Sequence, residues 1–154
     1  MSGRADDADP GAGDATDDRA SETSGDGAAS PTTDTVLVVD GDEEIREMVR
    51  FKLQREADVV TAADGRECWE YLDDHGDAPP GVVVLDVMMP GMNGRQVLRR
   101  IRDDRRFDDV AVVMLTSLGR SDEAVEALEA GATDYMSKPF SPDELLARIR
   151  RARG

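Results

Sequence analysis

The sequence is poor in cysteine and has no long apolar segment. Its one cysteine, Cys68, excludes an internal disulfide and a metal site built from several cysteines, which fits a reducing compartment. Cys68 lies in a stretch with helical periodicity, where we interpret it as a small buried side chain. The chain contains neither an apolar run of about 18 residues nor a signal-peptide pattern. We therefore expect a soluble cytoplasmic protein.

Lysine is also scarce, and acidic residues are in large excess. Lys52 and Lys138 are the only lysines among 19 basic residues, which face 34 acidic ones. Negative charge of this size repels phosphate backbones and anionic lipids, so we expect neither nucleic acid nor membrane as the main partner. Arginines cluster at positions 95–106, but interleaved aspartates favour a solvated charged face there. An Asp-rich, Lys-poor surface suggests the high-salt cytoplasm of a halophile.

The chain divides into two parts at Thr35. Residues 1–34 contain no Leu, Ile, Val or aromatic side chain, and we predict that they form a disordered acidic tail. Short apolar runs then alternate with amphipathic stretches to the end, which predicts one domain over residues 35–154. The predicted strands are 35–39, 57–62, 81–85, 110–115 and 134–137. The first predicted helix has Asp42 or Gly41 as its cap, the next three span 64–75, 93–102 and 121–130, and the last has its cap at Ser141.

The apolar runs are continuous rather than alternating. This pattern is typical of strands that are buried on both faces of a parallel sheet. Five strands that alternate with five helices predict an α/β fold, a doubly wound parallel sheet with helices on both faces.

Polar residues stand at the ends of four predicted strands. Asp40 follows the first, Asp86 the third and Thr116 the fourth, and Lys138 comes just after the fifth. In a parallel sheet these positions share the carboxyl edge, where ligands bind. Two adjacent carboxylates suit Mg²⁺, which takes one or two carboxylates, waters and a phosphoryl oxygen. Lys138 and Thr116 can bind further phosphoryl oxygens, so we expect a phosphoryl-binding site.

Four segments carry a resemblance to a known family. VLVVD (36–40), VVVLDVMMPGMNG (82–94), MLTS (114–117) and DYMSKPF (134–140) resemble, in order and spacing, the receiver domains of response regulators. The resemblance covers residues 35–154 and implies a flavodoxin-like (βα)5 fold of the CheY-like type, with strand order 2-1-3-4-5. It implies a receiver in a two-component phosphorelay, which is not an enzyme beyond transferring a phosphoryl group to itself and hydrolysing it. Because these residues show no second domain, we expect a receiver of the stand-alone type.

The resemblance also implies roles for the residues at the sheet edge. Asp86 would accept a phosphoryl group from a histidine kinase, and Thr116 and Lys138 would hold the phosphoryl oxygens. Mg²⁺ would be the cofactor, bound by Asp40, Asp86 and the backbone carbonyl of Met88.

The same resemblance implies a conformational switch. Tyr135 would change its rotamer together with Thr116, and the Lys138–Pro139 peptide bond would be cis. The face formed by the fourth helix, fifth strand and fifth helix would then bind a downstream effector protein.

The sequence departs from the family at Gly41. Receiver domains have a second acid at this position, which ligates the metal directly. Asp42 is a further candidate ligand, and water is another substitute. Two interpretations remain open: a receiver with weakened metal binding, or a scaffold that signals without phosphorylation. The family also places Met88 and Leu118 beside the path of attacking water, which predicts slow hydrolysis of the acyl phosphate.

A rival interpretation is an enzyme. The Asp-x-Asp pair in VVDGD resembles the motif of haloacid-dehalogenase-like phosphatases, with Asp40 as nucleophile and Asp42 as acid. The chain has little room for the usual cap of those enzymes, and the Asp86 loop would have no purpose there.

Overall fold

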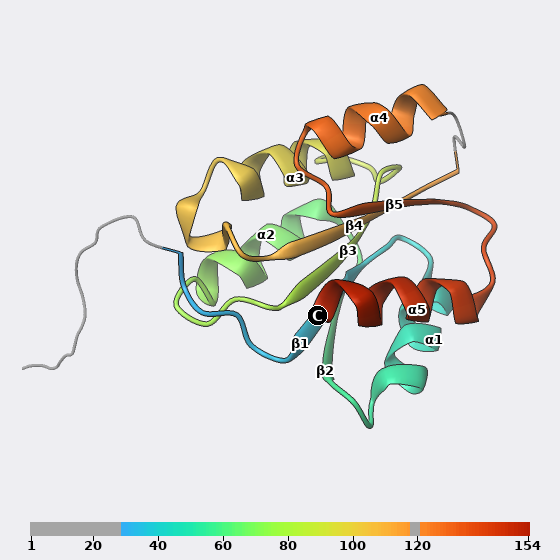
Figure 1. The fold of residues 1–154 in the computed structure, drawn as a ribbon, viewed down its shortest axis with the longest axis horizontal. Coiled ribbons are helices and arrows are strands. Elements are labelled where there is room, and N and C mark those ends of the chain that lie inside the picture. The colour runs from blue at the N-terminus through green and yellow to red at the C-terminus, as the bar shows by residue number, and fades with distance from the viewer. Residues whose placement is uncertain (1–28, 118–120) are drawn as a thin grey trace, which may run out of the picture.

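The computed structural model describes residues 29–117 and 121–154. In this part of the chain five parallel strands form one sheet in the order β2-β1-β3-β4-β5, which confirms the predicted fold and strand order (Figure 1). The strands are β1 Thr35–Val39, β2 Asp58–Ala62, β3 Val82–Asp86, β4 Ala111–Thr116 and β5 Asp134–Ser137. The helices are α1 Glu43–Leu53, α2 Gly65–Asp74, α3 Gly94–Arg102, the short η2 Arg105–Phe107, α4 Ser121–Glu129 and α5 Pro142–Arg153.

The strand boundaries agree with the sequence prediction to within one residue. Two of the small differences affect the candidate site, because β3 and β4 each extend one residue further than their apolar runs. Asp86 and Thr116 are therefore the last residues of their strands and are held in the ladder, where Asp86 lies opposite Leu115. The η2 turn was not predicted.

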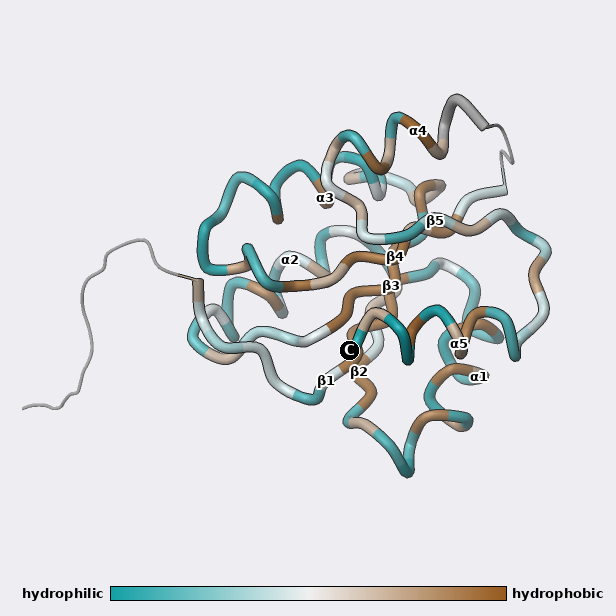
Figure 2. The backbone as a smooth tube through the Cα atoms, in the orientation of Figure 1, coloured by the Kyte–Doolittle hydropathy of each residue, from teal (hydrophilic) through white to brown (hydrophobic). Residues whose placement is uncertain are grey.

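The helices cover the sheet in two layers. Leu37, Val39 and the equivalent side chains of β3 and β4 pack against α2, α3 and α4. Val36, Val38 and their equivalents pack against α1 and α5 on the other face. Figure 2 shows apolar strands in the middle and hydrophilic segments on the outer helices. Burial on both faces explains why the strands read as continuous apolar runs.

Side-chain caps start the helices where the sequence indicates. The Asp42, Asp64 and Ser141 side chains each accept a hydrogen bond from a backbone N–H in the first turn of α1, α2 and α5. Asn93 forms a complete capping box with Gln96 at the start of α3. These caps satisfy N–H groups that have no partner inside the helix.

The last six residues of the predicted tail contact the domain. Residues 1–28 lie outside the described part of the chain, but residues 29–34 run along the domain. The Thr33 N–H donates to the Pro79 carbonyl at 2.8 Å, and the Ser30 N–H donates to the Arg106 carbonyl at 3.3 Å. Asp34 forms an ion pair with Arg153 of α5. The boundary predicted at Thr35 therefore falls inside a segment that contacts the fold.

Candidate functional site

Three buried polar side chains lie at the carboxyl ends of the central strands. Asp40 directly follows β1, Asp86 ends β3 and Thr116 ends β4, with exposed fractions of 1%, 4% and 1%. Within the described residues these are the only buried polar or charged side chains. Burying a polar group, and above all a carboxylate, is costly unless it has a charged or hydrogen-bonding partner, so two carboxylates and a hydroxyl buried at one sheet edge mark a site.

Lys138 supplies the positive charge of the site. Its Nζ lies 2.9 Å from Asp40 Oδ2 and 3.5 Å from Asp86 Oδ2. The Lys138 N–H donates to the Thr116 carbonyl at 2.6 Å, which ties the residue to the end of β4, and the Lys138–Pro139 bond is cis. The four residues selected from the sequence are thus gathered at one edge, with one ammonium facing two carboxylates.

Backbone amides hold the other oxygen of each acid. Asp40 Oδ1 accepts from the Asp42 N–H at 2.8 Å, and Asp86 Oδ1 accepts from the Met88 N–H at 3.1 Å. Each carboxylate is therefore fixed by its own loop and turns its second oxygen towards Lys138. This arrangement orients both acids before any ligand binds.

The surroundings raise the pKa of Asp86 above its ordinary value. Burial is the largest cause, and the negative charge of Asp40 acts in the same direction. The Lys138 ammonium and the Met88 N–H oppose the shift without cancelling it. Asp86 consequently binds its proton more tightly than a solvated aspartate, as expected for an acid in a reactive site.

The residues of the site fit a magnesium ion that keeps several waters. Asp40 and Asp86 supply two buried carboxylates, and the Met88 carbonyl belongs to the same loop. No group of three or more His, Cys, Asp or Glu side chains gathers in the described residues, so a third carboxylate is lacking there. Mg²⁺ often binds through only one or two carboxylates, with water and phosphate oxygens as its other ligands.

Gly41 and Asp42 show how the site differs from a three-carboxylate centre. A Cβ added at Gly41 would meet no atom within 4 Å, so the space for a side chain is open. Asp42 does not fill it, because it is exposed and its Oδ1 accepts from the Glu44 N–H at 2.9 Å as the cap of α1. Of the predicted ligands, Asp42 is the one whose carboxylate is engaged elsewhere.

Two residues that support the site were not singled out from the sequence. Arg46 of α1 donates to the Asp40 carbonyl at 2.8 Å. Gly94 begins α3 so close to β3 that an added Cβ would lie 2.3 Å from the Asp86 carbonyl oxygen. Gly94, the second glycine of PGMNG, was itself the available signal, since glycine often marks close backbone approach. Arg46 had no such signal, because its partner is a backbone atom.

The predicted switch residues lie next to this edge. Tyr135 of β5 is half-buried against the core layer of α2 and α3, and its hydroxyl is buried without a hydrogen-bond partner among the described residues. Thr116 and Ser137 are paired across β4 and β5. Leu118, predicted to flank the path of water, lies outside the described residues, whereas Met88 is 57% exposed.

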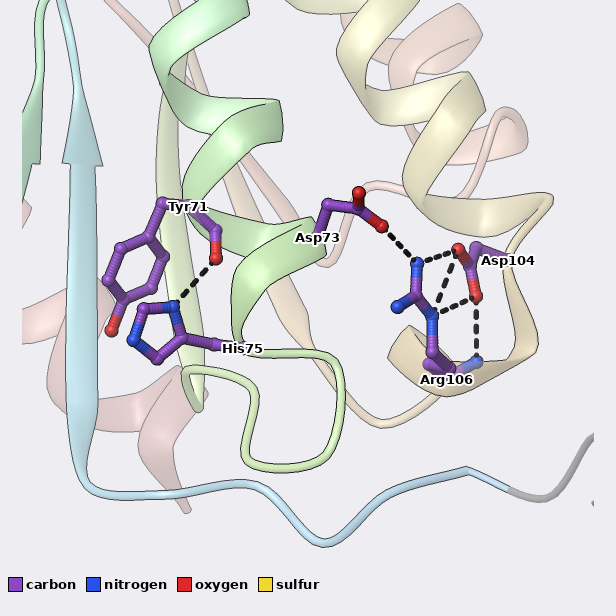
Figure 3. A network of polar contacts seen from close by, with 5 residues as sticks. All are labelled: Tyr71, Asp73, His75, Asp104 and Arg106. Carbon is purple, nitrogen blue, oxygen red and sulfur yellow. Dashed lines mark hydrogen bonds and ion pairs between the residues drawn. The ribbon is translucent and has the colours of Figure 1, made fainter. Parts of the chain in front are cut away.

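The one cysteine and the one histidine of the sequence play no part in the site. Cys68 is fully buried, and burial raises the pKa of its thiol to about 12, as expected for an unreactive side chain. His75 stacks on Tyr71 with ring centroids 4.0 Å apart and lies at the end of α2 (Figure 3).

Within the described residues, no helix is both long and apolar enough to cross a bilayer.

Comparison with known proteins identifies the family. Residues 36–150 match the response regulator receiver domain. The chain is 36% identical to chemotaxis protein CheY1 of Helicobacter pylori over 116 residues, 74% of this chain and 92% of that protein. It is 37% identical to the phosphate regulon transcriptional regulatory protein PhoB of Pseudomonas aeruginosa over 122 residues, 75% of this chain and half of that one.

Solved structures agree with the sequence matches. The chemotaxis protein CheY4 of Vibrio cholerae superposes with a TM-score of 0.69 at 33% identity, covering 81% of this chain and 99% of that one. The beryllofluoride-activated DrrB receiver domain gives 0.66 at 37% identity, covering 77% and 95%.

The chain belongs to the response regulator receiver domain family. It is therefore a receiver domain of two-component signalling, a class of generally non-enzymatic domains that work with histidine kinases and downstream effectors. It spans about half the length of the first curated relatives that it matches.

Proposed function

We propose that Asp86 is the phosphoacceptor of this receiver domain. The observation that carries the proposal is the buried Asp40–Asp86 pair, with the Lys138 ammonium within ion-pair distance of both acids. Thr116 ends the adjacent strand and is also buried. A nucleophilic carboxylate beside a cation and a hydroxyl is the set of groups that phosphoryl transfer requires.

The transfer reaction follows from these groups. An Asp86 oxygen attacks the phosphorus of a phosphohistidine, the P–N bond breaks, and the imidazole leaves with the electron pair. The product is an aspartyl phosphate. Lys138 and the Thr116 hydroxyl bind the phosphoryl oxygens. Because only the ionised carboxylate attacks, the raised pKa of Asp86 makes the transfer rate increase as the pH rises through that value.

Receiver domains generally bind Mg²⁺ at the phosphorylation site, and this chain has donors for it. Asp40, Asp86 and the Met88 carbonyl would hold the ion, which supplies positive charge opposite the phosphoryl oxygens. With glycine at position 41, the site offers less negative charge to attract the ion than a site with a second acid at that position. We propose a working receiver whose metal affinity is weakened.

Phosphorylation would act on the surface through Tyr135. Its hydroxyl has no hydrogen-bond partner among the described residues, so rotating the ring breaks no such bond there. We propose the face of α4, β5 and α5 as the effector-binding surface, and two exposed apolar side chains of α4, Val125 at 54% and Leu128 at 48%, support its α4 part. The exposed ion pair of Arg95 with Glu126 is a weak link between α3 and α4.

The proposed setting is the cytoplasm, with a histidine kinase as phosphodonor and an effector protein as target. The net charge of −15 argues against nucleic acid as a partner of these 154 residues. Relatives include both a receiver-length chemotaxis protein and longer transcriptional regulators, and a stand-alone arrangement remains a prediction. The proposed high-salt adaptation requires that the melting temperature rise between low and molar salt.

The family assignment and the geometry disfavour the phosphatase interpretation. A dehalogenase-like enzyme would use Asp42 as its acid, but Asp42 caps α1. The scaffold interpretation differs from ours only in predicting no phosphorylation.

Labelling by acetyl phosphate in the presence of Mg²⁺ tests the proposal. Asp86→Asn should abolish labelling, whereas Asp40→Asn should leave the acceptor present and weaken the Mg²⁺ dependence. Beryllofluoride should shift the Tyr135 ring resonance as Mg²⁺ is titrated. Labelling lost only in Asp40→Asn would support the phosphatase, and no labelling of the unmodified chain would support the scaffold.

A further inference from the structure

An arginine-lined groove lies far from the phosphoacceptor site. It has a volume of about 460 Å³, and we call it the arginine groove. It is lined by Trp69, Arg100, Asp103, Asp104, Arg105 and Arg106. The η2 turn that contributes Arg105 and Arg106 precedes β4, whereas Thr116 ends that strand. The groove is therefore near the amino ends of the strands, opposite Asp86.

The three arginines of the groove are not equally neutralised. Arg106 is held by Asp104 at 2.7 Å and by Asp73 at 3.0 Å (Figure 3). Arg100 instead lies over the Trp69 ring, 4.3 Å from its centroid, and Arg105 is exposed. Among the described residues neither Arg100 nor Arg105 has a carboxylate partner. Two guanidinium groups thus face solvent in a protein whose overall charge is strongly negative.

The course of residues 29–34 brings the acidic tail to this groove. From Thr33, bound to the Pro79 carbonyl, the chain runs to Ser30, whose N–H donates to the carbonyl of Arg106, a groove residue. Ala29 and Ser30 are half-buried, whereas residues 31–34 are exposed. Figure 1 shows this end of the described chain beside the connection between α3 and β4. The described chain therefore begins beside Arg106, at the edge of the arginine groove.

The charge of the preceding residues matches the groove. Residues 1–28 contain eight acids and only Arg4 and Arg19, a net charge of −6. Attachment beside the groove gives their carboxylates an effective concentration on the order of millimolar without any binding partner. The acids nearest to the groove in sequence are Asp26 and Glu22.

We propose that residues 1–28 of the acidic tail bind in cis to the arginine groove, with carboxylates of the tail pairing with Arg100 and Arg105. The tail then covers Trp69 and the exposed end of α3. An acidic partner protein would have to displace the tail to reach this surface. The contact is electrostatic, so salt weakens it. The proposal concerns a surface that phosphoryl transfer does not use and stands independently of it.

Paramagnetic relaxation in the full chain tests the proposal. A nitroxide is attached at Ser24→Cys, since the buried Cys68 thiol does not compete. The chain has one tryptophan, so its indole N–H gives one resonance. At about 20 mM salt we expect that resonance to lose most of its intensity, and at about 1 M salt to regain it. Arg100→Gln with Arg105→Gln should also restore it.

Matched variants separate this contact from general charge effects. Lys52→Gln with Arg55→Gln removes two charges from the groove between α1 and α5 and should leave the broadening intact. Glu22→Gln with Asp26→Asn should weaken it. The proposal is overturned if the Lys52 and Arg55 variant loses as much broadening as the Arg100 and Arg105 variant. It is also overturned if the broadening is unchanged in the Arg100 and Arg105 variant. Broadening that arises only between nitroxide-labelled and isotope-labelled copies overturns it as well, because the tail would then reach a second molecule.

Discussion

Two clusters in this protein each place two carboxylates around one cation. At the carboxyl edge of the sheet, Asp40 and Asp86 face Lys138. At the opposite end, Asp73 and Asp104 bind Arg106 (Figure 3). The first cluster is buried, with Asp40 and Asp86 at 1% and 4% exposure, whereas the side chains of Asp73 and Arg106 in the second are 60% and 37% exposed.

One acid in each cluster has a shifted pKa, and the two shifts have opposite directions. The pKa of Asp86 is raised, chiefly because burial penalises its charged form. The pKa of Asp104 is lowered, chiefly by its hydrogen bonds from the Arg106 side chain. The number of charges is the same, so the environment decides the sign. In the buried cluster the charged form of Asp86 is disfavoured, and a metal ion can offset that cost by supplying positive charge.

The opposite shifts also give opposite pH dependences of stability. The Asp104 contribution is present above the unfolded-state pKa and is lost as the pH falls through its lower folded-state pKa. Asp86 has a higher pKa in the folded state, so its charged form costs stability at neutral pH. That cost disappears as the pH falls through the raised pKa.

Removing the shared cation of the buried cluster should have the largest effect. Lys138→Gln leaves two buried carboxylates facing each other and removes a donor to the phosphoryl oxygens. We expect labelling by acetyl phosphate to fall about 100-fold. The melting temperature should also drop at neutral pH and partly recover in acid, as Asp86 takes up a proton. Lys52→Gln, on the exposed face of α1, is the control. Equal labelling in both variants would contradict the assigned role.

Adding a third carboxylate to the buried cluster should have the next largest effect. Gly41→Asp places a side chain in open space and supplies the second acid that the family resemblance implies at this position. We expect the Mg²⁺ concentration for half-maximal beryllofluoride binding to fall about tenfold. Gly41→Asn has the same shape without the charge and should not reproduce the gain. An unchanged Mg²⁺ dependence in both variants would mean that position 41 does not limit metal binding.

Changing the exposed rim of the site should have a moderate effect. Met88 is 57% exposed beside Asp86 and presents no polar group to an attacking water. In Met88→Asn the amide can orient that water, and one hydrogen bond of about 1 kcal/mol corresponds to dephosphorylation about fivefold faster. Decay of the phosphorylated protein measures the rate. Phe51→Asn, on the exposed side of α1, should leave it unchanged, and no acceleration in Met88→Asn would exclude this explanation of a long-lived phosphate.

Breaking the surface cluster should have the smallest effect. Asp104→Asn removes the charge that binds Arg106 and weakens the cap of η2. Because the pair is partly exposed, we expect a loss of about 1 kcal/mol in the free energy of unfolding at neutral pH, with labelling of Asp86 unaffected. Denaturant unfolding measures it. The loss should shrink as the pH falls through the pKa of Asp104, and a loss independent of pH would point to packing instead.

Local patterns were sufficient to predict most of the fold. Continuous apolar runs specify strands buried on both faces, and residues such as Asn93 and Ser141 begin helices through caps that involve only neighbouring residues. The position of Asp40, Asp86 and Thr116 at one edge also followed, because parallel strands bring their carboxyl ends together. The role of Gly94 was missed, because only the close approach of α3 to β3 leaves no room for a Cβ at this position.

The properties of the site depend on contacts between distant segments. Sequence indicated that Lys138 comes near Asp86, but its closer approach to Asp40 and the raised pKa of Asp86 result from packing around the sheet edge. Likewise, the backbone contact between Ser30 and Arg106 joins segments that no local pattern relates. Periodicity and capping are short-range and can be read along the chain. Burial, charge neighbours and the direction of a pKa shift are set by side chains far apart in sequence, and exist only after the chain has folded.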